Sequence, residues 1–156
     1  DKYGLDLAEV SDGTLEMNHD TKCEYIAKLS KQVTVISEVG SKQAGVVIPN
    51  DQWVAMMKNE LSAGSIKVIA EAREGGNIGI YNQDHSANTE LIDNIAHDIS
   101  IDDVQWEAPL KNQQAWFIKL FGANVNLGNI APTEVIALET LRVGLRGDTF
   151  FQFLNK

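Results

Sequence analysis

The feature that most constrains the fold of this sequence is a short apolar, β-branched run that recurs five times. Several of the runs are apolar at nearly every position, which is typical of strands buried on both faces of a parallel sheet. We therefore predict five parallel strands. They are Leu5–Val10, Val33–Val39, Ile66–Ala70, Val104–Ala108 and Val125–Ile130.

The segments between and after these runs carry apolar residues at helical spacing. Strands that alternate with helices at intervals of about 30 residues indicate βαβ units and a parallel sheet. No linker or low-complexity stretch divides the chain, so we predict a single α/β domain over residues 1–156. Both an open doubly wound sheet and a closed barrel share this pattern. The predicted helices are Thr21–Leu29, Asp51–Leu61, Glu90–His97, Asn112–Phe121 and Glu134–Leu145.

Composition and missing motifs exclude several classes of function. Neither a GxGxxG nor a GxxxxGK[ST] pattern occurs, so a nucleotide-binding doubly wound domain loses its main support. The net charge of −9 argues against bulk nucleic-acid binding. No apolar run approaches the length of a membrane span, and the single cysteine excludes an internal disulfide. We therefore expect a cytoplasmic protein with no membrane partner.

Acidic residues recur where the predicted strands end. Glu9, Glu38 and Glu71 each lie at or next to the end of a run, and Glu107 follows Val104–Trp106. In a barrel the carboxyl ends of all strands converge on one mouth, where the active site lies. Four such acids facing one mouth would suit a hard divalent cation, or a mixture of metal ligands and acid–base groups. Alternatively, the glutamates point outward and form structural ion pairs.

Cationic residues follow three of these acids within a few positions. Lys42, Arg73 and Lys111 are expected on the loops beyond the strand ends. An acidic protein needs such local positive groups to hold an anionic substrate. Each cation taken separately is also explained as a solvated surface charge, and only the recurrence beside the glutamates favours a site.

Several longer stretches resemble the phosphosulfolactate synthase family. They are EVSDGTLEM (9–17), SEVGSK (37–42), KVIAEAREGG (67–76), WEAPLKNQQ (106–114), GANVNLGNI (122–130) and LETLRVGLRGDT (138–149). The resemblance implies a (β/α)8 TIM barrel and a Mg²⁺-dependent lyase-type enzyme. It also implies that phosphoenolpyruvate and sulfite are the substrates, joined to give (2R)-2-O-phospho-3-sulfolactate on the way to coenzyme M.

The chemistry implied by this resemblance assigns roles to particular residues. For the metal we expect some subset of Glu38, Glu71 and Glu107. We expect Lys42 to be the proton donor, with Lys111 as the second choice, and Glu107 is also a catalytic candidate. The candidate substrate-binding residues are Arg73, Asn126, Gly128, Asn129, Arg142 and Arg146. Asp148, in the same stretch as Arg142 and Arg146, is expected to pair with Arg146.

The chain departs from the family in length. Family members are longer, and we match this chain to strands 4–8 of their barrel, as a fragment that begins at Asp1. Five strands cannot close an eight-stranded barrel, so two exposed edges are expected. Two alternatives therefore stay open: a non-catalytic relative associated with stress, and a truncated product that assembles through its edges, including as a homo-oligomer.

Overall fold

The structure is a computed structural model and describes residues 4–13, 15, 17–41 and 47–153. Strands and helices alternate along these residues. The strands are β1 (Leu7–Val10), β2 (Thr34–Val39), β3 (Lys67–Ala70), β4 (Val104–Glu107) and β5 (Leu127–Gly128). The helices are α1 (His19–Leu29), α2 (Asn50–Ala63), α3 (Thr89–Asp98), α4 (Lys111–Phe121), α5 (Val135–Arg142) and α6 (Phe150–Phe153), with 3₁₀ turns at Ile101–Asp103 and Pro132–Glu134.

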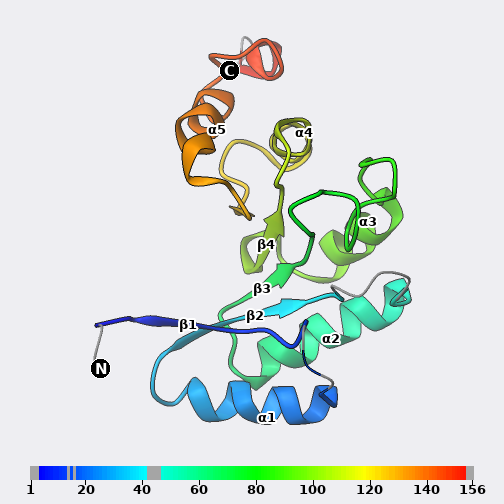
Figure 1. The fold of residues 1–156 in the computed structure, drawn as a ribbon, viewed down its shortest axis with the longest axis vertical. Helices are drawn as coiled ribbons and strands as arrows, with labels where there is room; N and C mark the ends of the chain where they lie inside the picture. The colour runs from blue at the N-terminus through cyan, green and yellow to red at the C-terminus, as the bar shows by residue number, and fades with distance from the viewer. Residues whose placement is uncertain (1–3, 14, 16, 42–46, 154–156) are drawn as a thin grey trace.

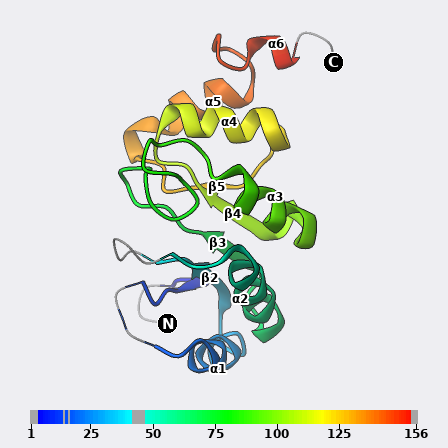
Figure 2. The ribbon, with the colours of Figure 1, turned by 90° about the vertical axis from the view of Figure 1, so that its right-hand side faces the viewer.

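The five strands form one sheet in the order β1-β2-β3-β4-β5, and every neighbouring pair is parallel. Each connection between strands contains a helix, as parallel pairing requires. The helices follow the sheet from α1 and α2 at one end, past α3, to α4 and α5 at the other (Figure 1). Figure 2 shows the strands between the α1–α2 pair and the α4–α5 pair. The predicted parallel α/β architecture is confirmed.

Side chains of the central strands alternate between the two faces of the sheet. Val39, Ala70 and Trp106 belong to the continuous core that packs the helices against the sheet, and each is fully buried. Their neighbours along the strands therefore face the opposite side. The same alternation continues beyond β3, where Ala72 is again part of the core and Glu71 is not.

The predicted elements agree with the structure except near the C-terminus. The fifth strand pairs only over Leu127–Gly128, although Val125–Ile130 was predicted. The last long helix ends at Arg142, because the chain turns at Gly144 with a φ of 72° that favours glycine. Within the described part of the chain, none of the helices combines the length and apolar character needed to cross a bilayer.

Candidate active site at the carboxyl ends of the strands

Three glutamates lie where β2, β3 and β4 end, on the face of the sheet opposite the helix-packed core; we call Glu38, Glu71 and Glu107 the rim carboxylates. The register of β3 with β4 places Glu71 and Glu107 side by side, with backbones roughly 5 Å apart. Glu38 pairs with Ile69, two residues before Glu71, and so lies one step toward the amino end. The predicted gathering of these three acids at one edge is therefore observed.

Glu107 is held by backbone and amide donors from both neighbouring strands. Its Oε2 accepts hydrogen bonds from the Ala72 backbone N–H at 2.6 Å and from Asn129 Nδ2 at 3.4 Å. Asn129 also donates to the Ala72 carbonyl oxygen at 2.9 Å, and its φ of 55° lies in the left-handed region. The predicted substrate-binding residue Asn129 thus lies at the rim, where it joins the ends of β3 and β5.

Tyr81 supports the same strand end from the long β3–α3 loop. Its hydroxyl donates to the Glu107 backbone carbonyl oxygen at 2.7 Å. Burial, together with the nearby charge of Glu107, raises the pKa of Tyr81, so the hydroxyl keeps its proton and remains a donor. The carboxyl end of β4 is therefore fixed through both its side chain and its backbone.

Glu71 is almost completely buried, at 1% exposure, and lies against Gly40 at the end of β2. Gly40 has a φ of 148°, and a Cβ built there would lie 2.6 Å from Glu71 Cβ and 3.0 Å from Trp53. Only glycine fits between these two side chains. The buried carboxylate of Glu71 is thus packed closely by the backbone of the neighbouring strand.

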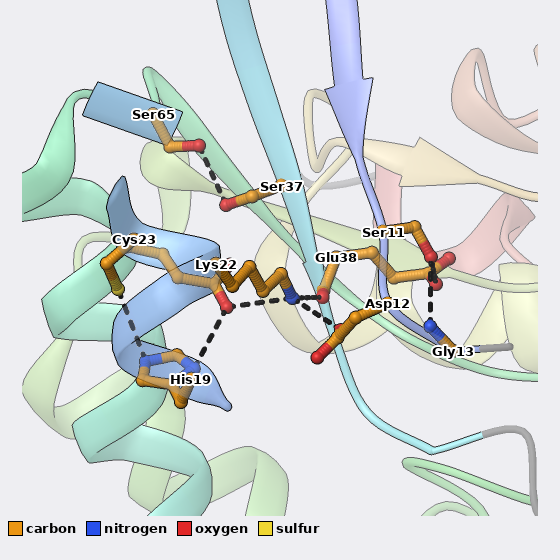
Figure 3. Close-up of polar contacts among 10 residues, drawn as sticks. Ser11, Asp12, Gly13, His19, Lys22, Cys23, Ser37, Glu38 and Ser65 are labelled. Atoms are coloured by element: carbon orange, nitrogen blue, oxygen red, sulfur yellow. Dashed lines mark hydrogen bonds and ion pairs between the residues drawn. The ribbon is translucent and has the colours of Figure 1, made fainter. Parts of the chain in front are cut away.

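Glu38 is held by a hydroxyl from the β1–α1 loop. Its Oε1 accepts a hydrogen bond of 2.6 Å from Ser11 Oγ (Figure 3). Glu9, the fourth strand-end acid of the sequence, is exposed on edge strand β1 and pairs with Ile36, two residues before Glu38. Glu9, Glu38 and Glu71 therefore lie at successive steps along the sheet, and Glu107 is level with Glu71.

A charged cluster lies behind Glu38, between the sheet and helices α1 and α2 (Figure 3). Lys22 Nζ contacts Asp12 Oδ1 at 2.8 Å, Glu60 Oε1 at 2.9 Å and the Glu38 carbonyl oxygen at 2.5 Å. Burial lowers the pKa of Lys22, but the charges and hydrogen bonds of Glu60 and Asp12 outweigh it and raise the pKa overall. Burial raises the pKa of Glu60, and Lys22 opposes that shift only in part.

Two of the three predicted cations fall in the described part of the chain. Arg73 is exposed on the loop after β3, at the rim end of the sheet. Lys111, in the first turn of α4, forms a 2.7 Å ion pair with Asp148 at the protein surface. The expected Asp148–Arg146 pair is therefore wrong, since Arg146 donates to Thr140 instead. Lys42, the first choice for a proton donor, lies outside the described residues.

Two predicted substrate-binding residues lie at the opposite end of the sheet. Asn126 donates to the carbonyl oxygens of Asp102 and Val104, at the start of β4. Arg142, near the end of α5, donates to the carbonyl oxygens of Ala123 and Val125 before β5 begins. We leave both out of the proposed site, because the rim carboxylates lie at the carboxyl ends of the strands.

Gly128 and Arg146 occupy different positions relative to the rim. Gly128 pairs with Glu107 and packs tightly against the Gln105 side chain, at the rim level. Arg146 is exposed beyond α5 and hydrogen-bonds within its own segment. The predicted binding set is therefore split, with Gly128 and Asn129 at the rim and Asn126, Arg142 and Arg146 away from it.

The donor set of the rim suits a hard cation bound mainly through substrate and water. Among the described residues, no three histidine, cysteine, aspartate or glutamate side chains gather closely enough to hold a metal by themselves. Mg²⁺ is commonly bound by one or two carboxylates that leave the remaining positions to water and substrate phosphate. The neighbouring Glu71 and Glu107 carboxylates fit this arrangement.

Sequence reasoning missed the residues that support the rim. Ser11, Asp12 and Tyr81 lie in loops with no periodic pattern, so nothing local indicated their partners. Lys22 and Glu60 did carry a signal, because each places a charge on an apolar stripe: Lys22 precedes the buried Ile26 by one helical turn. A charge on the core side of a predicted helix indicates a buried partner.

Comparison with known proteins finds relatives that match nearly the whole chain. The family model for (2R)-phospho-3-sulfolactate synthase matches residues 1–148. A phosphosulfolactate synthase of Bacillus subtilis is 43% identical over 96% of this chain and 60% of its own length. Those of Methanothermobacter thermautotrophicus and Methanocaldococcus jannaschii are 41% and 38% identical, over 94% and 96% of this chain and 58% and 61% of theirs. The chain thus spans about three-fifths of the relatives it matches.

Proposed function

This chain belongs to the (2R)-phospho-3-sulfolactate synthase family, and we propose that it carries the active-site edge of such a synthase. The reaction proposed is the Mg²⁺-dependent addition of sulfite to phosphoenolpyruvate, which forms (2R)-2-O-phospho-3-sulfolactate. The observation that carries the proposal is the presence of Glu38, Glu71 and Glu107 on one face, where three adjacent parallel strands end.

Addition of sulfite to the methylene carbon of phosphoenolpyruvate develops negative charge on the substrate carboxylate, as in an enolate. Stabilising that charge is the largest catalytic demand. Glu71 and Glu107 would hold the divalent cation, which would supply a Lewis acid for this charge. The hydrogen bonds from Ala72 and Asn129 fix the Glu107 carboxylate, so its orientation does not depend on the ligand.

The remaining steps require a proton and anion-binding groups. The carbon that bears the phosphate takes up one proton after sulfite has added, and a lysine whose pKa is lowered by its surroundings suits this role. Lys42 stays our first choice and Lys111 the second. The Lys111–Asp148 ion pair, directed along the surface, makes Lys111 the weaker candidate. Arg73, exposed beside the rim, suits phosphate or sulfite through its planar guanidinium.

The complete fold of the family is proposed to be a (β/α)8 barrel to which this chain contributes strands 4–8. The parallel order β1 to β5 and the helices over one face support that assignment. The family's substrates also favour a cytoplasmic location.

A second function, assembly through the sheet edges, is favoured by one observation. Within the described residues, β1 and β5 each pair on one side only. Leu5 and Leu7 are exposed at the β1 edge, and Val135 and Ile136 are exposed on α5 next to β5. Unpaired parallel edges with apolar neighbours are prone to association. Size-exclusion chromatography with light scattering measures the oligomeric state directly. A monomer at all concentrations would reject assembly between copies.

The test of the synthase proposal is a coupled assay for sulfite-dependent loss of phosphoenolpyruvate with Mg²⁺, using the Bacillus subtilis relative as a positive control. We expect turnover by this chain, and a loss of at least about 100-fold in kcat for Glu107→Gln. The matched control is Glu90→Gln, an exposed glutamate on α3, which should leave turnover unchanged. Inactivity of this chain beside an active relative would reject catalysis by the chain itself.

A further inference from the structure

We propose that Lys22 is a positioning residue that fixes the β1–α1 loop against the end of β2 and, through Ser11, sets the orientation of the rim carboxylate Glu38. The inference deepens the proposed function, because it concerns the support of one of the same carboxylates. Lys22 is fully buried, so it holds the site from behind and does not contact substrate.

The burial of Lys22 calls for a role beyond stability. Lys22 and Glu60 are both fully buried, and taking two charges out of water costs several kcal/mol for each ion. An apolar pair of similar volume often serves stability equally well or better. A buried lysine is therefore better explained by what its three contacts hold in place.

Those contacts join three separate segments. Lys22 Nζ reaches Asp12 in the β1–α1 loop, the backbone carbonyl of Glu38 at the end of β2, and Glu60 on α2. The ammonium group donates hydrogen bonds to Asp12 and to the Glu38 carbonyl oxygen, and it supplies the opposite charge for Glu60. A neutral residue of the same length could not satisfy these oxygens.

The loop that Lys22 holds is the one that reaches Glu38. Ser11 precedes Asp12 directly, and its hydroxyl donates to Glu38 Oε1 at 2.6 Å. The loop also turns on itself, because the Leu15 N–H donates to the Asp12 carbonyl oxygen at 3.0 Å. Figure 3 shows the end of the Lys22 side chain pointing toward both Asp12 and Glu38, with Ser11 beyond Glu38. Releasing Asp12 therefore releases Ser11, and Glu38 loses its hydroxyl donor.

The helix-side end of the Lys22 cluster is buried and contacts several elements. Glu60 lies on α2 and is held within packed structure, and next to it Ser65 Oγ donates to Ser37 Oγ at 2.7 Å on β2. His19 Nδ1 lies 3.7 Å from Glu60 Oε1 on the other side. Because this end is enclosed by α1, α2 and β2 while the Asp12 side chain is partly exposed, we expect a lost contact to release the loop first.

The test compares amide hydrogen exchange in three variants of this chain by NMR. Lys22→Met removes the charge and keeps the length. Asp12→Asn weakens the Lys22–Asp12 contact at its partly exposed end and leaves the buried Lys22–Glu60 pair intact. Lys28→Met, on the exposed side of the same helix, is the matched control. We expect the Leu15 amide to exchange at least about tenfold faster in the first two variants, with the α3 amide of Ile92 unchanged in Asp12→Asn.

Equal acceleration at Leu15 and Ile92, or no acceleration in Asp12→Asn, would overturn the proposal and leave Lys22 a general stabilising residue. The catalytic consequence is read separately in Ser11→Ala, which should lower kcat about tenfold with little change in KM. A wild-type chain without sulfite-dependent turnover would count against the proposed function, whereas the exchange rates would still decide the role of Lys22.

Discussion

The two halves of the sheet hold their rim carboxylates by different physical means. At β4, Glu107 is held by a backbone N–H and an amide, over a core in which Trp106 stacks near Phe117 and Phe121 with ring centroids 5.2 and 5.4 Å away. At β2, Glu38 is held by a loop hydroxyl, over a buried cluster built around Lys22. The donors to Glu107 are placed by the ends of the neighbouring strands. The Ser11 donor to Glu38 is placed by a loop that depends on the charge of Lys22 and its partners.

The two halves should therefore be destabilised by different kinds of change. The β4 half should respond to lost volume and hardly to pH, because its support contains backbone and aromatic groups. The β2 half should respond to the loss of a single charge and to alkaline pH. The following variants separate the two.

The largest effect is expected for Trp106→Ala in the β4 half. Trp106 is fully buried, and removing an aromatic side chain from a core typically costs about 3–5 kcal/mol of unfolding free energy. Urea unfolding followed by circular dichroism measures the loss. Trp116→Ala, at a partly buried site on α4, is the control and should cost clearly less. Equal costs would mean that Trp106 does not organise this half.

The next effect is expected for Lys22→Met in the β2 half. Removing one partner of a buried ion pair leaves an uncompensated charge, with an expected loss of about 3 kcal/mol. Combining Lys22→Met with Glu60→Met should recover much of that loss, because the second charge is removed as well. Denaturant unfolding of the four proteins in this cycle gives the coupling. Strictly additive losses would show that the two charges do not act as a pair.

A smaller effect is the pH dependence of the same half. The folded-state pKa of Lys22 is raised above its ordinary value of 10.5, since the acids around it outweigh burial. Its stabilisation is therefore present in full below about pH 10.5 and is lost as pH rises through the folded-state pKa. The gap in unfolding free energy between wild type and Lys22→Met should stay constant from about pH 7 to pH 10 and narrow above that. A gap that widens there would contradict the assignment.

The smallest effect is expected at the exposed Lys111–Asp148 pair beside the β4 half. The hydrogen bond and charge of Lys111 lower the pKa of Asp148 from its ordinary 3.8. Stability from this group is present above that value and is lost as pH falls through the folded-state pKa. In Lys111→Met, NMR titration should return the Asp148 pKa to about 3.8 with little change in unfolding midpoint. An unmoved pKa would place the cause elsewhere.

The fold could be predicted from the sequence wherever the pattern was local. Apolar runs located all five strands, and helical spacing located helices α1 to α5 to within a few residues, whereas the short helix α6 was not predicted. The exception was the fifth strand: Val125 is buried and apolar, but only Leu127–Gly128 pairs with β4. Burial and pairing are separate properties, and a hydrophobic pattern reports only the first.

The site was predicted less completely, for a related reason. The strand-end glutamates were found because parallel topology brings equivalent positions together. The positions of Asn126 and Arg142 were not predicted. A polar side chain before β5 or near the end of α5 can point toward the mouth or away from it. Contacts with Asp102 and Ala123, which are distant in sequence, decide the direction. The Lys22–Glu60 pair joins two helices across 38 positions, which no local window registers.

The central claim is that both halves present their carboxylates to one reaction site, and a kinetic double-mutant cycle tests it most directly. Glu38→Gln, Glu107→Gln and the double variant are assayed for sulfite-dependent loss of phosphoenolpyruvate with Mg²⁺. If the two act as a unit, the double variant loses hardly more kcat than the worse single variant. Losses that multiply as independent factors, or a Glu38→Gln chain with full turnover, would contradict the claim.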